Sequence, residues 1–348
     1  MEGIPSAEKL TKAEIMEILE CEEYGRMPPP PISVRGEVIK RESFCAGKAW
    51  LETVTITCET ENGPFSFPVL LTVPSAEGKH ACFIHIAFRD NIPDRYMPSE
   101  ELIDNGFAAF TMCYKDITND TPDFSDGLAE VIFPSGRTSA EDCGKIMLWA
   151  WAAMRVMDYA ETRADIDSGC ISVCGHSRLG KTALLAGALD ERFFCAFSNN
   201  SGTCGAALSR SKSPDSEHIS DIVRSFSYWF CDNFKKYADN EEIMPFDQHF
   251  LLAANFPHRV YAASAAGDFW ADPQNEFRAC LAADKYFRLH GIEGITADKT
   301  EANPGDNFDG GYIGYHMRNG THYFSREDWQ KFMKYVCRHR NGEWRERK

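Results

Sequence analysis

The feature that most constrains the fold is an alternation of apolar strand patterns with helix patterns, which begins after residue 80. The strand patterns are ACFIHIAF, FAAFTMCY, CISVCG, CAFSNN, RVYAASA and YIGYHMR. Such an alternation predicts the α/β class, with a mostly parallel central sheet and helices on both faces, in a three-layer sandwich. Three further strand patterns lie between residues 36 and 74, and we expect them to form an antiparallel edge of the sheet.

Two parts of the chain fall outside this alternation. Residues 1–35 show a helix pattern followed by a proline run, which predicts an N-terminal helical arm and a stiff extended connection. We expect residues 36–348 to form a single domain. Within it, we interpret residues 203–257, which are rich in Ser, Asp and aromatic residues, as a lid-like insertion. Within the domain, a long helix is predicted over residues 138–163, opened by a Thr-x-x-Glu capping box.

Charge and composition exclude several classes of partner. The chain carries 37 basic and 52 acidic residues, so neither nucleic acid nor an anionic membrane is expected, because both attract clustered positive charge. No apolar run approaches the ~20 residues of a membrane-spanning helix. The segment MEGIPSAEKLTKAEIMEILE lacks the pattern of a signal peptide, and the thirteen cysteines include no C-x-x-C pair. We therefore expect a cytoplasmic protein with reduced thiols, no metal and no cofactor.

One turn carries the main functional signal. It reads Gly175-His176-Ser177-Arg178-Leu179-Gly180-Lys181-Thr182, between a strand pattern and a helix pattern. This sequence matches the phosphate-binding loop G-x-x-x-x-G-K-[ST], whose backbone N–H groups and helix dipole bind phosphate. It also approaches the nucleophile elbow G-x-S-x-G, in which a serine projects from a sharp strand-to-helix turn, although the second glycine comes one position late. The turn alone leaves both interpretations open.

The order of later residues favours the elbow. α/β-Hydrolases place a serine, then an acid, then a histidine after successive strands. Downstream of Ser177, the strand RVYAASA is followed by Asp268, and the strand YIGYHMR is followed by His322. A phosphate-binding loop requires no such histidine. The order predicts an α/β-hydrolase with Ser177 as nucleophile, His322 as general base and Asp268 as the acid that orients the imidazole.

Two details of this assignment remain open. Asp272 is an alternative acid, although its place before Pro273 is also that of a helix N-cap. The oxyanion formed in ester hydrolysis needs hydrogen-bond donors, and the backbone N–H of Arg178 is one. The stretch after the first buried strand, residues 85–89, contains no glycine loop that would supply another.

Several segments spread over residues 40–335 carry a family resemblance. They are CGHSRLGKTALLAGALDERF, SNNSG, GAALSR, SYWF, PFDQH, DFWADP and RNGTH. Their co-occurrence resembles carbohydrate esterase family fifteen, the glucuronoyl esterases and their bacterial relatives. The resemblance implies an α/β-hydrolase fold, a serine esterase mechanism without metal, and an ester of 4-O-methyl-glucuronic acid as substrate. Acetyl xylan esterase activity is the alternative within the same fold; a phosphate-binding-loop nucleotide hydrolase and a non-catalytic sugar-binding protein are alternatives of other classes.

The resemblance also implies roles for individual residues. The side chain of Arg178 is implied as the second oxyanion donor, Lys181 as a ligand of sugar hydroxyls and Trp270 as the residue that packs on the uronate. Glu217 is implied as a further sugar ligand, in surroundings that depart from the family pattern. Some family members carry their acid at the position of Asn200, where an amide cannot supply the charge, so the resemblance also assigns the orienting role to Asp268.

Overall fold

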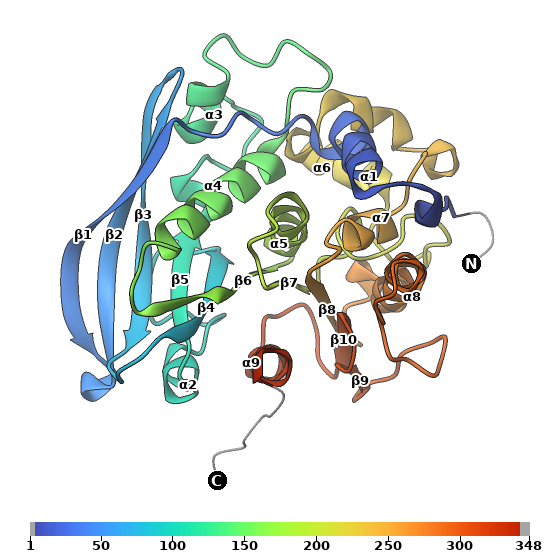
Figure 1. The fold of residues 1–348 in the computed structure, drawn as a ribbon. Helices are drawn as coiled ribbons and strands as arrows, with labels where there is room; N and C mark the ends of the chain where they lie inside the picture. Colours follow the sequence, from blue (N-terminus) through green and yellow to red (C-terminus); the bar gives the residue numbers. More distant parts are fainter. Residues whose placement is uncertain (1–3, 342–348) are drawn as a thin grey trace.

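The computed structural model describes residues 4–341, and within them the centre of the molecule is a ten-stranded sheet (Figure 1). The strand order is β1-β2-β3-β5-β4-β6-β7-β8-β10-β9. From β5 through β4, β6, β7 and β8 to β10 the strands are parallel, whereas β1, β2 and β3 form an antiparallel edge, as predicted. The strands are β1 Ser33–Phe44, β2 Ala49–Thr60, β3 Gly63–Pro74, β4 His80–Ala87, β5 Ala108–Cys113, β6 Ile166–His176, β7 Cys195–Asn199, β8 Arg259–Ala265, β9 Asn307–Phe308 and β10 Ile313–Arg318.

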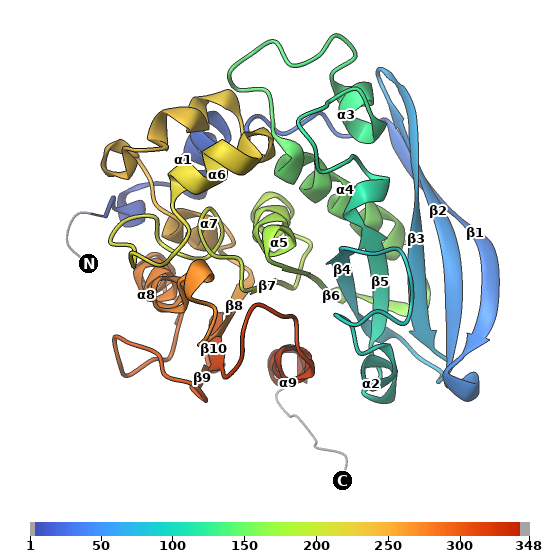
Figure 2. The same ribbon diagram turned by 180° about the vertical axis from the view of Figure 1, so that it is seen from behind.

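Helices cover both faces of the sheet, which confirms the predicted three-layer α/β fold (Figures 1 and 2). Helices α1, α4, α5, α7 and α8 pack on one face, and α2 and α9 pack on the other. The helices are α1 Lys12–Leu19, α2 Ser99–Asp104, α3 Gly127–Ile132, α4 Lys145–Ala160, α5 Arg178–Leu189, α6 Ile219–Phe226, α7 His249–Ala253, α8 Pro273–Leu289 and α9 Arg326–Asn341.

The two helical layers enclose separate apolar cores because successive side chains of a strand point to opposite faces. In β4, Ile84 and Ile86 belong to the core under α4 and α5, whereas Phe83 belongs to the core under α9. In β6, Val173 and Cys174 divide in the same way. Strands buried on both faces read as continuous apolar runs, which is why their positions are predictable from sequence.

Helix α4 begins later than the sequence predicts. The N–H of Thr138 donates to Asp142 Oδ2 at 2.6 Å, so the capping acid of that turn is Asp142 and not Glu141. Glu141 is instead paired with Arg26, whose Nε lies 2.8 Å from Glu141 Oε2. Residues 138–144 are therefore held by the N-terminal segment, and the helix starts only at Lys145.

The N-terminal segment and residues 203–257 both lie on the face that carries α5. Helix α1 is capped by a Thr11–Glu14 capping box and buries Ile15 and Leu19 in the main core. Residues 203–257 include α6, the turn η5 (Ser227–Trp229) and α7. Part of this segment faces the carboxyl ends of the strands, where the candidate site lies.

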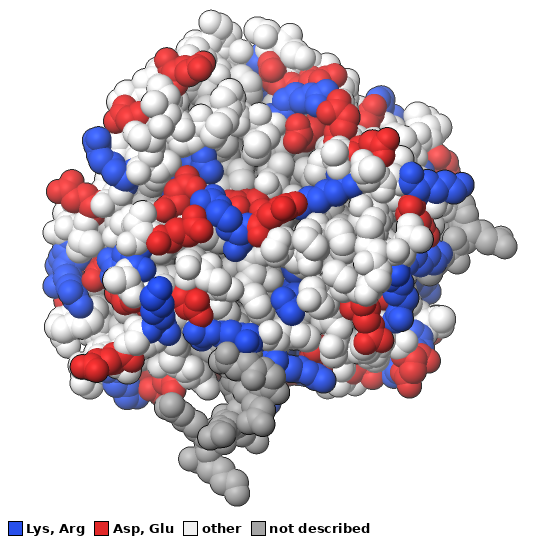
Figure 3. All heavy atoms as spheres, in the orientation of Figure 1, with Lys and Arg blue, Asp and Glu red and all other residues white. Residues whose placement is uncertain are grey.

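The surface is electrostatically mixed. Figure 3 shows Lys and Arg side chains interspersed with Asp and Glu over the face seen in Figure 1. Among the described residues, no helix is long and apolar enough to cross a membrane. The thirteen cysteines are unpaired, and most of them are buried.

Candidate active site

Ser177 is the single residue between β6 and α5, and it forms the sharp turn that joins them. Its backbone has φ 58° and ψ −129°, a strained conformation for a residue with a side chain. Such strain costs about 1–3 kcal/mol and persists where the surrounding structure enforces it. Here the Ser177 N–H donates to Asn199 O at 2.9 Å, and a Cβ at Gly175 would lie 2.1 Å from Leu179 O. Only glycine fits at position 175, as a nucleophile elbow requires.

The late second glycine also has a structural reason. Leu179, where the usual elbow has glycine, is fully buried in the main core. Gly180 takes over the close contact, since a Cβ there would lie 2.9 Å from Ser198 Oγ. The departure from G-x-S-x-G therefore leaves the elbow geometry intact.

The same geometry rules against a phosphate-binding loop. Helix α5 starts at Arg178, and the N–H groups of Gly180 and Lys181 already donate to Ser177 O. The Nζ of Lys181 donates to Ser201 O at 2.5 Å and Thr203 O at 2.6 Å. Residues 175–182, all of which the structure describes, thus form no open loop that could wrap around a phosphate.

His322 and Asp268 meet at the carboxyl ends of neighbouring strands. Strands β8 and β10 are parallel and adjacent, so the turns that follow them lie side by side. His322 Nδ1 donates to Asp268 Oδ2 at 2.6 Å, which leaves Nε2 free to accept a proton. Asp268 is 6% exposed and His322 is 45% exposed. Asp272 instead caps α8 and accepts the N–H of Asn275, so the structure pairs His322 with Asp268 rather than with Asp272.

One cavity of about 420 Å³, which we call the Ser177 cavity, is lined by every residue singled out from the sequence for catalysis or binding, except the alternative acid Asp272. Their positions range from 177 to 322, and four strand ends and the 203–257 segment bring them together. The lining residues are Ser177, Arg178, Lys181, Asn200, Ser201, Gly202, Glu217, Phe226, Trp229, Asp268, Trp270, Ala271 and His322.

His176, which the sequence analysis did not single out, packs directly on His322. The two ring centroids are 4.4 Å apart. Burial, followed by the neighbouring His322, lowers the pKa of His176 to about 3, and its Nδ1 lies 2.6 Å from Asn199 Oδ1. His176 therefore stays neutral at physiological pH and does not repel a positive charge on His322.

Arg178 is held by a second residue that the sequence did not reveal, Asp120. The Asp120 carboxylate accepts from Arg178 Nη1 and also from Trp229 Nε1, at 2.7 Å from Oδ1. The guanidinium lies 4.6 Å from the Trp229 ring centroid, in cation–π geometry. Arg178 Nε is buried and has no hydrogen-bond partner, and Arg178 lines the same cavity as Ser177. Asp120 follows β5 in an irregular segment, and no local motif marks it.

Lys181, Glu217 and Trp270 lie together in the wall of the Ser177 cavity. Lys181 is buried, and its Nζ lies 3.9 Å from Glu217 Oε2. The Glu217 N–H donates to Trp270 O at 2.9 Å, which ties the 203–257 segment to the turn after β8. Trp270 is 53% exposed, so its ring remains accessible from solvent. This wall offers a cation, a carboxylate and an aromatic surface within one cavity.

Asn200, which also lines the cavity, and Glu276 are linked through the loop that follows β7. Asn200 is buried, and neither its amide nitrogen nor its amide oxygen has a hydrogen-bond partner. Glu276 of α8 is fully buried and accepts from Ser264 Oγ at 2.5 Å and Gly202 N at 2.9 Å. Burial raises the pKa of Glu276 to about 7. Its hydrogen bonds fix the loop that presents Asn200 and Ser201 to the cavity.

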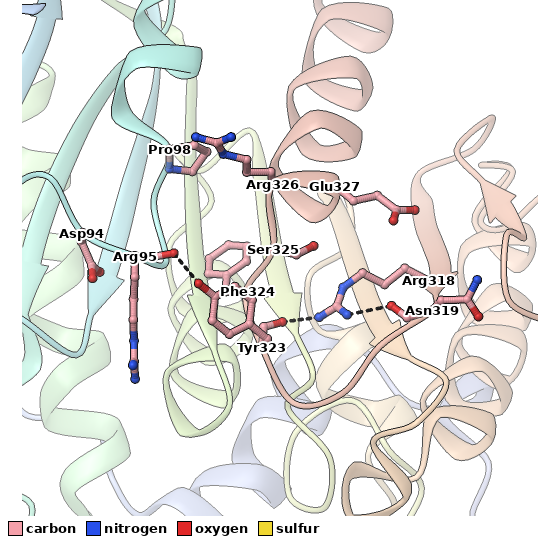
Figure 4. Close-up of a pocket in the computed structure, with 10 residues that line it drawn as sticks. All are labelled: Asp94, Arg95, Pro98, Arg318, Asn319, Tyr323, Phe324, Ser325, Arg326 and Glu327. Carbon is pink, nitrogen blue, oxygen red and sulfur yellow. Dashed lines mark hydrogen bonds between the residues drawn. The ribbon is translucent and has the colours of Figure 1, made fainter.

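Arg318 and Arg95 hold the loop that carries His322 through Tyr323, which lies between them in Figure 4. Arg318 donates to Tyr323 O and, at 3.0 Å, to Asn319 O, while Tyr323 OH donates to Arg95 O at 2.9 Å. These residues line a separate cavity of about 490 Å³. The bonds hold both ends of the short segment in which His322 lies. Within residues 4–341, no three His, Cys, Asp or Glu side chains gather as a metal site would require.

A serine on a strained turn, followed in chain order by an acid and a histidine on the next strand ends, is the arrangement of the α/β-hydrolases. That is the class of protein that this fold and site define. A profile of the family described as "Glucuronyl esterase, fungi" matches residues 56–291, which is more than half of the chain. The chain belongs to this family, the glucuronoyl esterases of carbohydrate esterase family 15.

Individual relatives agree with this assignment. The chain is 40% identical over 246 residues to carbohydrate esterase MZ0003 from an unknown prokaryotic organism, covering 70% of this chain and 56% of that protein. It is 28% identical over 291 residues to 4-O-methyl-glucuronoyl methylesterase 1 of Phanerochaete chrysosporium, covering 80% and 57%. The chain thus spans little more than half the length of these relatives. The structure of a glucuronoyl esterase from Solibacter usitatus superposes with a TM-score of 0.84 at 32% identity, covering 94% of this chain and 91% of that one.

Proposed function

We propose that this protein hydrolyses carboxylic esters of a uronic acid, as a glucuronoyl esterase, through a covalent acyl-enzyme. The observation that carries the proposal is the Asp268–His322 hydrogen bond in the same cavity as Ser177. A serine hydroxyl is a weak nucleophile at neutral pH and needs a base that is held in one tautomer. The names of the relatives point to a 4-O-methyl-glucuronoyl ester as the substrate class.

The proposed reaction has two halves. In the first, Ser177 Oγ attacks the ester carbonyl while His322 Nε2 takes its proton, and His322 then gives that proton to the departing alcohol. In the second, water attacks the acyl-enzyme, His322 takes a proton from the water, and Ser177 leaves with that proton as the uronic acid is released. Asp268 stabilises the imidazolium in both halves. The Arg178 N–H and the unused Arg178 Nε serve as donors to the oxyanion.

We propose that Lys181, Glu217 and Trp270 recognise the acyl group. Lys181 and Glu217 provide a donor and an acceptor for sugar hydroxyls, and the exposed ring of Trp270 covers an apolar sugar face. An acetyl group carries neither hydroxyls nor a ring, so these three side chains would have no partner in the acyl group of an acetyl ester. Their presence therefore favours a uronoyl ester over an acetyl ester.

The test compares benzyl glucuronate with an acetylated xylo-oligosaccharide as substrates. We expect turnover of the first to exceed that of the second, and Ser177→Ala to abolish it. Full activity in Ser177→Ala would refute the site assignment. Faster release of acetate would establish the deacetylase alternative, and binding of uronate without hydrolysis of either ester would establish a non-catalytic sugar-binding protein.

A further inference from the structure

His176 is a buried side chain next to the nucleophile to which the proposed reaction gives no role. It is the last residue of β6, directly before Ser177, and it is 2% exposed. Its ring centroid lies 4.4 Å from that of His322, and the two ring planes are inclined by 43°. Rings whose centroids are this close are in contact, so His176 limits the positions that the His322 ring can take.

Asn199, the last residue of β7, ties His176 and Ser177 to the same neighbouring strand. The Nδ1 of His176 donates to Asn199 Oδ1 at 2.6 Å, and the N–H of Ser177 donates to Asn199 O at 2.9 Å. The pairing of β6 with β7 places His176 opposite Asn199. An amide oxygen only accepts, so Nδ1 carries the ring proton and the orientation of the ring is fixed relative to the nucleophile.

Two further aromatic rings hold the His176 ring in place. The Tyr96 centroid lies 5.1 Å from it, and the Phe324 ring stacks on it at 6.2 Å with an angle of 23°. Tyr96 also packs on Tyr323, at 5.0 Å between centroids. Tyr323 and Phe324 directly follow His322 in the chain, so the same cluster of rings fixes both His176 and the backbone that carries the imidazole.

The His322 ring needs such a contact, because its other restraint fixes only one of its atoms. Among the described residues, its side chain has one hydrogen bond, from Nδ1 to Asp268 Oδ2, and it is 45% exposed. A hydrogen bond tolerates a misalignment of about 30°, and a tilt of that size moves Nε2, on the far side of the ring, by on the order of 1 Å. A misplacement of about 1 Å can lower a rate by about 100-fold.

The contact suits both protonation states of His322. Burial, followed by the neighbouring His322, lowers the pKa of His176 to about 3, so the His176 ring is uncharged at physiological pH. His322 becomes cationic when it takes the proton of Ser177, and a second cation at this distance would repel it. A neutral flat ring does not, so the contact persists before and after the proton transfer.

Resting on the proposed function, in which His322 is the general base, we propose that His176 is a positioning residue for the reaction. Its ring fixes the plane of the His322 imidazole and keeps Nε2 where it takes the proton of Ser177. This role complements that of Asp268, which fixes the tautomer and the position of Nδ1. His176 acts only through His322 and binds no part of the substrate.

The test measures two reactions of Ser177. One is turnover of benzyl glucuronate; the other is covalent labelling by an alkyl fluorophosphonate, which needs the activated hydroxyl but no sugar. We expect His176→Ala to lower kcat and the labelling rate by about 10- to 100-fold each, with KM within about twofold. His176→Phe restores a flat neutral ring and should recover both rates to within about fivefold of wild type.

Two further variants separate positioning from damage to the fold. His176→Leu fills the volume without a flat ring, so it should be as slow as His176→Ala and replaces that variant if it does not fold. His249→Ala is the matched control: His249 is also 2% exposed, and it lies in α7, outside the described lining of the Ser177 cavity. This control should keep both rates within about twofold.

A double variant tests whether His176 acts through His322. Once His322 is alanine, His176→Ala should cause no further loss of labelling rate. An additive loss, a fall confined to KM, or a His176→Phe variant no faster than His176→Leu would overturn the inference. If wild type is labelled but does not hydrolyse benzyl glucuronate, the proposed function fails and the labelling rates alone decide the inference. If Ser177 is not labelled at all, both are overturned.

Discussion

His322 Nδ1 and Asp268 Oδ2 lie 2.6 Å apart, although 53 residues separate these two in the chain. The pair is formed because β8 and β10 are adjacent parallel strands and both residues follow the carboxyl end of their strand. A carboxylate at this distance fixes the imidazole tautomer and favours its protonated form when a charge develops. The properties of this pair lead to the first prediction.

Asp268→Asn should lower kcat by about three to four orders of magnitude, because an amide can stabilise the wrong tautomer of His322 and cannot balance its charge. The matched control is Asp272→Asn. Asparagine caps a helix about as well as aspartate, so that variant should keep its activity on benzyl glucuronate. The measurement is steady-state hydrolysis of benzyl glucuronate, and a comparable fall in Asp272→Asn would contradict the assignment.

Asp120 should act on the reaction only through Arg178. Arg178→Ala removes a donor to the oxyanion and should lower kcat by about 10²–10³-fold. Asp120→Asn should lower kcat by about tenfold, because the guanidinium loses its carboxylate, and it should have no further effect once Arg178 is alanine. Asp123→Asn, on the same segment, is the control. Additive losses in the double variant would show that Asp120 acts by another route.

Lys181→Ala should affect substrate binding and folding together. It leaves Ser201 O and Thr203 O without their buried donor, which costs about 1–3 kcal/mol of unfolding free energy. It should also raise KM more than it lowers kcat, since Lys181 is proposed to bind sugar hydroxyls rather than the reacting atoms. Urea unfolding and steady-state kinetics measure the two effects, and a loss confined to kcat would argue against this role.

Glu276 should make stability fall as pH rises. Its pKa is about 7 in the folded protein, owing to burial, against an ordinary value of 4.5, so between these values the folded state keeps a proton that the unfolded chain has released. Stability from this proton is complete below about pH 4.5 and is lost as pH rises toward 7, by on the order of 3 kcal/mol. The neighbouring charge of Asp268 raises the pKa of this carboxyl further, and the charge of Lys181 lowers it.

The measurement is urea unfolding of wild type and Glu276→Gln from pH 4 to pH 8. Glutamine cannot ionise, so the difference in unfolding free energy between wild type and the variant should shrink or reverse in sign as pH rises. The other titrating groups are common to both proteins and cancel in this difference. Parallel stability curves would show that Glu276 does not titrate in this range.

Local sequence was sufficient for the central sheet and for the order of the site. Strand β8 spans the residues of its predicted pattern, because a strand buried on both faces needs an unbroken apolar run. The turn at Ser177 was recognisable because a glycine is required where the chain doubles back on itself. By contrast, the helix predicted from Thr138 begins only at Lys145, because Glu141 forms a salt bridge with Arg26, which is distant in sequence.

The layered α/β fold and the order of serine, acid and histidine follow from local sequence, because period-two and helical patterns and sharp turns are properties of short segments. The pairing of His322 with Asp268 rather than Asp272 depends on the three-dimensional fold. The contacts of Asp120 with Arg178 and of His176 with His322 depend on it in the same way. These choices depend on which strand ends are neighbours and which irregular segments pack across them. Such contacts join residues distant in the chain, so no local pattern records them.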